Sequence, residues 1–384
     1  MRSGPHGSAR WSPSGIGGPA IGSSPRVLGW VCAAVLATAG CGLLSAPALA
    51  GVANAGLARA PRSNPLAGMR WGNYAGPLDE VLPAYRAASG PQRRLLGLIA
   101  LRPRVHWFGS QYSDAEAEQV ARQYIDSVTG GRSDVLSQIA IFRLQPWEQA
   151  ACRRLSSADE QASYKRWIDG FAAGIGAARV ALVLQPDLPF ALCVPHRSRL
   201  PLALVAYAAQ RFGALPHTTV YIDAGAADYE TVGQAASLLR DAGVRNARGF
   251  ALDATHYDST EHQILFGAQI VRALAAAHLA GRHFVVNTAE NGRPFTYQQY
   301  QGRGGSNYDN ATVCGSRASR RCVTLGIPPT TNVADRRWGL SSRARAIAAN
   351  LVDGYLWIGR PWLENQAYPF DLQRALALAR TSPF

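Results

Sequence analysis

The chain has 384 residues, of which 47% are hydrophobic, and a formal net charge of +14. This length permits one large domain or two small ones with an ordinary hydrophobic core. Nearly all of the positive charge is arginine, because Lys165 is the only lysine. The arginines are scattered along the chain and form no basic helix face with interleaved aromatic residues. The composition therefore argues against a nucleic-acid-binding protein.

The N-terminal segment has the pattern of an export signal. An arginine-containing Gly/Ser/Pro-rich stretch precedes an apolar run over 27–44, and Ala48-Leu49-Ala50 is a small-x-small cleavage pattern. We expect a secretory signal peptide with an extended n-region over 1–50, a linker over 51–63 and one folded domain over 64–384. A lipoprotein signal and an uncleaved anchor are the alternatives. Cleavage would leave the mature chain without a stable membrane span.

The cysteine count agrees with export. Two of the six cysteines leave with the predicted signal, and four remain: Cys152, Cys193, Cys314 and Cys322. An even number in an exported protein suggests two disulfides, although spacing alone does not choose among the three possible connectivities. No Cys-x-x-Cys pair or histidine cluster indicates a metal site.

Short apolar runs alternate with helical patterns along the rest of the chain. Strands are predicted over 138–142, 180–184, 218–222, 247–252, 283–286 and 355–358, and helices over 159–175, 202–212, 229–242 and 261–280. Such alternation predicts βαβ units around a parallel sheet. The count favours a single-domain barrel of seven or eight strands. No Gly-x-Gly-x-x-Gly follows a strand, so a dinucleotide is not expected. Residues 301–321 read as a long loop over the sheet, and long loops are often functional.

Two of the predicted strands end in aspartate. Asp187 follows the strand over 180–184, and Asp223 ends the strand over 218–222. The carboxyl ends of parallel strands are where α/β barrels keep their catalytic groups. Inverting glycoside hydrolysis needs a protonated acid and, about 6.5–9.5 Å away, a carboxylate that activates water. Asp187 suits the acid because apolar residues flank it and desolvation raises a carboxyl pKa. The alternative is that each aspartate only caps the next loop or helix.

Several blocks together resemble glycoside hydrolase family 6, the secreted inverting cellulases and cellobiohydrolases. The similar blocks are Asn64-Pro65-Leu66-Ala67-Gly68, the helix over 164–169, Gln185-Pro186-Asp187, Tyr221-Ile222-Asp223-Ala224-Gly225, and the segments 325–331 and 355–361. The resemblance implies a distorted (β/α) barrel of about seven parallel strands that hydrolyses β-1,4-glucosidic bonds in cellulose-type polysaccharides with inversion. It also implies a monomer, secreted or retained at the cell envelope, with a β-glucan as its partner and no metal or organic cofactor.

The resemblance also assigns roles to individual residues. It makes Asp187 the proton donor, Glu148 the group that tunes Asp187 or positions water, and Asp223 an electrostatic stabiliser of the site. Trp107 and Tyr229 would hold sugar rings.

Asp253 stands where the family has a substrate-binding Asn. The family's first disulfide corresponds to Cys152–Cys193. Because its fourth cysteine is missing here, Cys314 is expected to pair with Cys322.

The departures from the family pattern are concentrated at the same site. Ala226 replaces a histidine, Glu290 replaces an arginine, and the loop over 359–366 lacks the family's Lys, Glu and Asp. Two further hypotheses follow: a catalytically impaired glycan-binding pseudoenzyme of the same fold, and a hydrolase for another envelope glycan. His106, His256 and His262 are predicted to be surface or loop histidines.

Overall fold

The computed structural model describes residues 63–300 and 308–384. The predicted signal peptide over 1–50 and nearly all of the predicted linker lie outside these residues. The centre of the described part is a sheet of parallel strands paired in the order β1-β3-β4-β5-β6-β7-β8, with β2 also paired to β3. The strands are β1 (Arg70–Trp71), β2 (His106–Gly109), β3 (Val135–Phe142), β4 (Val180–Leu184), β5 (Thr218–Asp223), β6 (Gly249–Leu252), β7 (His283–Asn287) and β8 (Val352–Leu356).

The sheet curls until its two sides approach each other. The backbone N–H of Val105, just before β2, donates to the carbonyl of Trp357, just after β8, at 2.9 Å. The indole Nε1 of Trp107 donates to the carbonyl of Ile358 at 2.8 Å. These bonds bring the end of the last strand beside the first full-length strand. The predicted distorted barrel of about seven parallel strands, in one domain, is therefore confirmed.

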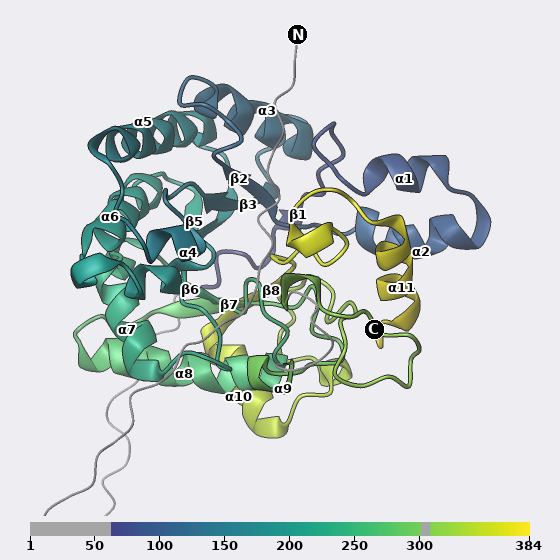
Figure 1. The fold of residues 1–384 in the computed structure, drawn as a ribbon. Helices are drawn as coiled ribbons and strands as arrows, with labels where there is room; N and C mark the ends of the chain where they lie inside the picture. Colours follow the sequence, from purple (N-terminus) through teal and green to yellow (C-terminus); the bar gives the residue numbers. More distant parts are fainter. Residues whose placement is uncertain (1–62, 301–307) are drawn as a thin grey trace, which may run out of the picture. The chain divides into compact units, whose positions relative to one another are not determined.

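Helices cover the outside of the barrel (Figure 1). They are α1 (Leu82–Ala87), α2 (Gly90–Ala100), α3 (Ala117–Thr129), α4 (Glu148–Ala151), α5 (Ala158–Ile175), α6 (Leu200–Gly213), α7 (Val232–Asp241), α8 (Thr260–Ala276), α9 (Tyr297–Tyr300), α10 (Ser342–Leu351) and α11 (Leu372–Thr381). The first two helices pack beside the last one, α11, on one side of the barrel (Figure 1). The four predicted helices correspond to α5, α6, α7 and α8. The sequence analysis did not predict strands β1 and β2 or helices α1, α2, α3, α4, α9, α10 and α11.

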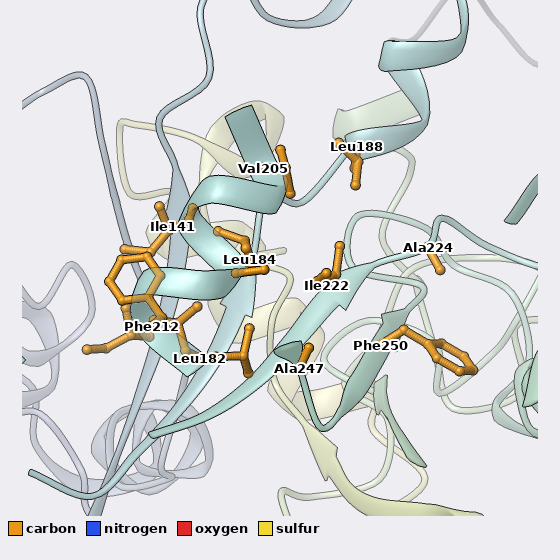
Figure 2. Close-up of a cluster of buried hydrophobic side chains, with 14 of the residues drawn as sticks. Ile141, Leu182, Leu184, Leu188, Val205, Phe212, Ile222, Ala224, Ala247 and Phe250 are labelled. Atoms are coloured by element: carbon orange, nitrogen blue, oxygen red, sulfur yellow. The ribbon is translucent and has the colours of Figure 1, made fainter. Parts of the chain in front are cut away.

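Alternate side chains of each strand enter two different cores. Leu182 and Leu184 of β4 point outward and pack in a cluster that includes Val205 and Phe212 of α6 (Figure 2). Ala181 and Val183 of the same strand join the inner cluster inside the barrel. Successive side chains of a strand face opposite ways, so a central strand that is buried on both faces must be apolar throughout.

Two disulfides join the four cysteines as predicted, Cys152 with Cys193 and Cys314 with Cys322. The first connects the C-terminal end of α4 to the end of the 3₁₀ turn η1 (Leu188–Leu192). The second closes a short loop before β8. Within residues 63–300 and 308–384, no helix is long and apolar enough to cross a bilayer.

Candidate active site

Asp187 lies immediately beyond the carboxyl end of β4, on a turn with unusual backbone geometry. Gln185 and Asp187 both have left-handed backbone angles, with φ of 54° and 62°. Glu148 after β3 and Asp253 after β6 share this feature, with φ of 50° and 66°. Non-glycine residues in this region are strained, and such strain tends to gather at functional sites. The four residues follow the carboxyl ends of β3, β4 and β6, the edge at which α/β barrels keep their catalytic groups, and this edge is the candidate site.

The half-buried side chain of Asp187 is held from the neighbouring loop. The hydroxyl of Thr255 donates to Asp187 Oδ1 at 2.7 Å. Burial raises the pKa of Asp187 above its ordinary value, while the Thr255 hydrogen bond and the positive charge available on His256 oppose that rise. Asp187 is thus a carboxyl group that is easier to protonate than one in water.

Glu148 lies at the start of α4, close enough to Asp187 for their charges to interact. Burial, followed by the negative charges of Asp187 and Asp309, raises the pKa of Glu148 to about 7. The Cys152–Cys193 disulfide joins α4 to the turn that Asp187 begins. This bridge holds the two carboxyl groups on adjoining segments, so the predicted pair is brought together.

Asp223, at the end of β5, lies beneath the Asp187 turn and has only 1% of its surface exposed. Its Oδ2 accepts a hydrogen bond from the backbone N–H of Gly225 at 3.2 Å. Burial and the charge of Asp187 raise the pKa of Asp223 well above its ordinary value, although backbone N–H groups of Gly225, Leu188 and Asp187 act in the opposite direction. Asp223 is therefore placed to stabilise the turn that carries Asp187, and not to contact a sugar.

Asp253 is fully buried, with 0% of its surface exposed. Its Oδ1 accepts from Gln263 Nε2 at 3.2 Å, and its carbonyl accepts from Asn287 Nδ2 at 2.8 Å. A side chain with no exposed surface does not touch a sugar in this conformation. The structure therefore does not support the expectation that Asp253 contacts substrate directly, and places it behind the site.

Trp107 and Tyr229, the two predicted sugar platforms, lie at different parts of the edge. Trp107 projects from β2 toward the inner core and packs against Phe142 at a ring distance of 5.7 Å. The Arg360 guanidinium lies 4.4 Å from the centroid of the Trp107 ring. Tyr229 is 38% exposed and stacks on the ring of His256 at 4.5 Å. Tyr229 keeps more open ring surface for a ligand than Trp107, whose ring is covered by a cation.

Of the three histidine predictions, the one for His106 is wrong. His256 lies in the loop after β6, as predicted, and is half-buried within the site, where its Nδ1 lies 3.1 Å from Asp228 Oδ1 and 3.2 Å from the Tyr308 hydroxyl. His106 lies on β2 and stacks on Tyr124, and burial lowers its pKa to about 3. Histidine burial depends on tertiary packing, which a sequence pattern does not contain. The third, His262, lies in the exposed first turn of α8, as predicted.

Asp309 is a member of the site that the sequence analysis missed. It lies on the 3₁₀ turn η4 (Tyr308–Asn310), within the long loop expected to be functional, and keeps exposed surface. Burial of the carboxyl group by its surroundings and the charge of Asp187 raise the pKa of Asp309 to about 6, while His256 opposes the rise. Three carboxyl groups with raised pKa therefore act on one another here.

Glu290 explains part of the departure from the family pattern. It is fully buried and accepts a hydrogen bond from Asn287 Nδ2 at 3.0 Å. Burial raises the pKa of Glu290 well above its ordinary value, although Arg374 and Arg360 act in the opposite direction. A Cβ on Gly359 would lie only 2.0 Å from Glu290 Oε1. The glycine thus leaves room for the carboxyl group, and a lysine would not fit beside it.

The described residues contain no group of three or more His, Cys, Asp or Glu side chains arranged to hold a metal ion.

Comparisons with known proteins agree with this architecture. The family model "Glycosyl hydrolases family 6" matches residues 70–361. Endoglucanase A of Cellulomonas fimi is 31% identical over 224 residues, which cover 58% of this chain and 47% of the relative. Endoglucanase 1 of Streptomyces halstedii is 29% identical over 231 residues, covering 58% and 69%. The chain thus spans about half the length of the Cellulomonas relative.

Solved structures extend the comparison across the barrel. The endoglucanase Cel6 of Mycobacterium tuberculosis, in complex with methyl-cellobiosyl-4-deoxy-4-thio-β-D-cellobioside, is 26% identical. It superposes with a TM-score of 0.66 over 83% of this chain and 99% of its own. The catalytic core of the cellobiohydrolase Cel6A of Chaetomium thermophilum, 18% identical with a TM-score of 0.61 over 84% of this chain and 99% of its own, shares the fold. The family match covers most of the chain, and the chain belongs to glycosyl hydrolase family 6.

Proposed function

We propose that this protein is a secreted β-1,4-glucanase that hydrolyses cellulose-type polysaccharides with inversion, and that Asp187 protonates the leaving oxygen. The observation that carries the proposal is the convergence of Asp187 and Glu148, held on adjoining segments by a disulfide, at the carboxyl edge of the barrel. A similar endoglucanase has been solved with a cello-oligosaccharide analogue, which supports a β-glucan as the substrate class.

The proton for the leaving group comes from a coupled set of carboxyl groups. Because Glu148 and Asp309 have pKa values of about 7 and about 6, the set retains a proton close to neutral pH. Interacting sites titrate together, so this proton belongs to the set and is available to Asp187. Asp187 Oδ1 is engaged by Thr255, which leaves Oδ2 to face the glycosidic oxygen. Asp223 supports the turn from below.

The aromatic side chains of Tyr229 and Trp107 would grip the sugar rings. The apolar face of a glucosyl ring gains contact area on an aromatic ring. Tyr229 is the better placed of the two, because its exposed ring lies over His256 and its hydroxyl is under the influence of Asp187 and Asp223.

We further propose that residues 1–50 direct export, that 51–63 link them to the catalytic domain over 64–384, and that the mature protein is a secreted or envelope-retained monomer. Two disulfides are consistent with an oxidising compartment, because such bridges persist mainly in exported proteins.

The test uses the mature protein purified from the medium or envelope of its producing cell, on soluble and crystalline β-1,4-glucans. We expect Asp187→Asn to lose about 10²–10⁴-fold in kcat, the usual contribution of a general acid. Asp159→Asn, on the exposed first turn of α5, is the matched control and should retain full activity. Glycan binding without turnover, unchanged by Asp187→Asn, would instead support the pseudoenzyme hypothesis.

A further inference from the structure

We propose that Asp309 is the carboxylate that activates the attacking water, opposite Asp187. This inference rests on the proposed function, because a catalytic base has meaning only if the glycosidic bond is hydrolysed. Inversion needs a second carboxylate on the far side of the sugar from the acid. By the resemblance of the loop over 359–366 to the family's final loop, the aspartate of that loop corresponds to Asn365, whose amide cannot accept the proton of water.

The fold places Asp309 beside the position of that missing aspartate. Asn365 lies in the 3₁₀ turn η6 (Glu364–Gln366), and η4, which carries Asp309, packs directly against η6. Glu364 of η6 and Asp309 of η4 are both exposed, and Asp309 interacts electrostatically with Asp187. The carboxylate of Asp309 on η4 therefore lies near the position at which η6 carries Asn365 in place of an aspartate.

Tyr308 anchors the turn that carries Asp309. Its carbonyl accepts a hydrogen bond from the Tyr257 hydroxyl at 2.9 Å, and its own hydroxyl lies 3.2 Å from His256 Nδ1. Its ring packs against those of Tyr297 and Tyr300, at centroid distances of 5.0 and 5.3 Å. A residue held through its backbone carbonyl, its hydroxyl and its ring leaves η4 little freedom, which fixes the backbone that carries Asp309.

The same network reaches the proposed acid. His256 follows Thr255, whose hydroxyl holds Asp187, and the Thr255 carbonyl accepts from Gln366 Nε2 of η6 at 3.1 Å. The loop after β6 therefore touches Asp187 on one side and both η4 and η6 on the other. This arrangement sets the acid and the proposed base in a defined relation to each other.

The charges around Asp309 suit a base that works beside a protonated partner. Asp187, Glu148, Glu290, His256 and Tyr257 are among the titratable groups that interact with it. The negative charge of Asp309 raises the pKa of Glu148, so an ionised Asp309 favours retention of a proton in the set, as a base beside a protonated acid requires.

The step balances without any co-reactant other than water. Asp309 takes one proton from water as the water oxygen forms a bond to the anomeric carbon. The glycosidic C–O bond breaks, its electron pair stays on the leaving oxygen, and that oxygen takes the proton of Asp187. Exchange with solvent then returns the proton from Asp309 and restores Asp187.

The experiment compares Asp309→Ala with Asp187→Asn in the full mature protein, on a cello-oligosaccharide and on 2,4-dinitrophenyl β-cellobioside. A base is needed whatever the leaving group, so Asp309→Ala should lose about 10²–10⁴-fold in kcat on both substrates. Asp187→Asn should recover on the dinitrophenyl substrate, which needs no proton. Sodium azide should restore Asp309→Ala and give the α-cellobiosyl azide. Asn310→Ala, on the same turn, should stay within about threefold of wild type on both substrates.

Asp309→Ala activity close to wild type, or an absence of azide rescue in a variant that retains wild-type ligand binding, would overturn the proposal. A wild-type protein without turnover would contradict the proposed function itself, and with it the role of Asp309 as a base. The proximity of Asp309 to Glu148 can be tested separately from activity. Asp309→Asn should lower the pKa of Glu148 in a carboxyl NMR titration. An unchanged Glu148 pKa would show that the two groups do not face each other.

Discussion

Glu148→Gln should make the protein more stable at alkaline pH while impairing its activity. The pKa of Glu148 rises from an ordinary 4.5 to about 7 in the folded protein, chiefly through burial. The folded state therefore binds this proton more tightly than the unfolded state. Its contribution to stability is fully present below pH 4.5 and is lost as the pH rises through 7. Above pH 7 the buried charge is a net cost, and glutamine removes it.

The size of the effect follows from the two pKa values. At about 1.36 kcal/mol per pKa unit, they set a ceiling of about 3.4 kcal/mol. Because the Glu148 side chain is only half-buried, solvent screens part of this energy, and we expect a gain of about 1–2 kcal/mol.

Urea unfolding of wild type and Glu148→Gln at pH 4 and pH 8.5 measures the effect. The two proteins should differ little at pH 4, and the variant should be the more stable at pH 8.5. Glu160→Gln is a control of opposite sign, because a hydrogen bond from Arg154 lowers the pKa of Glu160 to about 2. Its contribution is present above pH 4.5 and lost as the pH falls through 2, so this variant should be slightly less stable at pH 8.5, by at most about 1 kcal/mol. A Glu148→Gln protein no more stable than wild type at pH 8.5 would refute the description of Glu148 as a desolvated carboxyl beside Asp187.

Two further predictions concern the pH profile and the disulfides. The kcat/KM profile should fall on its alkaline side near pH 7, where the coupled carboxyl groups lose their last proton, and Glu148→Gln should move this limb to lower pH. An alkaline limb at the same pH in wild type and variant would show that Glu148 does not influence the proton used in catalysis. The Cys152–Cys193 bridge joins residues 41 apart in the sequence, and replacing both cysteines by serine should lower the unfolding free energy by about 4 kcal/mol. The same replacement should also reduce kcat. Replacing the Cys314–Cys322 bridge, with a separation of 8, should cost about 2.5 kcal/mol and leave kcat nearly unchanged, as measured by urea unfolding and initial rates.

The sequence predicted the barrel because each central strand is apolar on both faces and is followed by a polar turn. Val180–Leu184 is a clear case, and the strand over 180–184 was predicted with its observed bounds. Helix α3 was missed although its pattern was available, since Val120, Tyr124 and Ile125 recur at helical spacing and are buried.

The rest of the site could not be read from local patterns. Asp309 lies in a loop without periodicity, and the position of its turn is set by the packing of Tyr308 against residues from other loops. The charge of Arg374 on α11, far along the chain, partly opposes the pKa rise that burial causes at Glu290. Such groups become visible only when distant segments have been brought together.

The central claim is that Asp187 and a water molecule cleave the β-1,4-glucosidic bond in a single displacement. The most direct test is a proton NMR time course of cello-oligosaccharide hydrolysis, begun within the first minutes and before mutarotation. The account predicts that the α-anomer of the newly formed reducing end appears first and that Asp187→Asn suppresses it. A β-anomer that appears first, or a ligand that binds and is never cleaved, would contradict it.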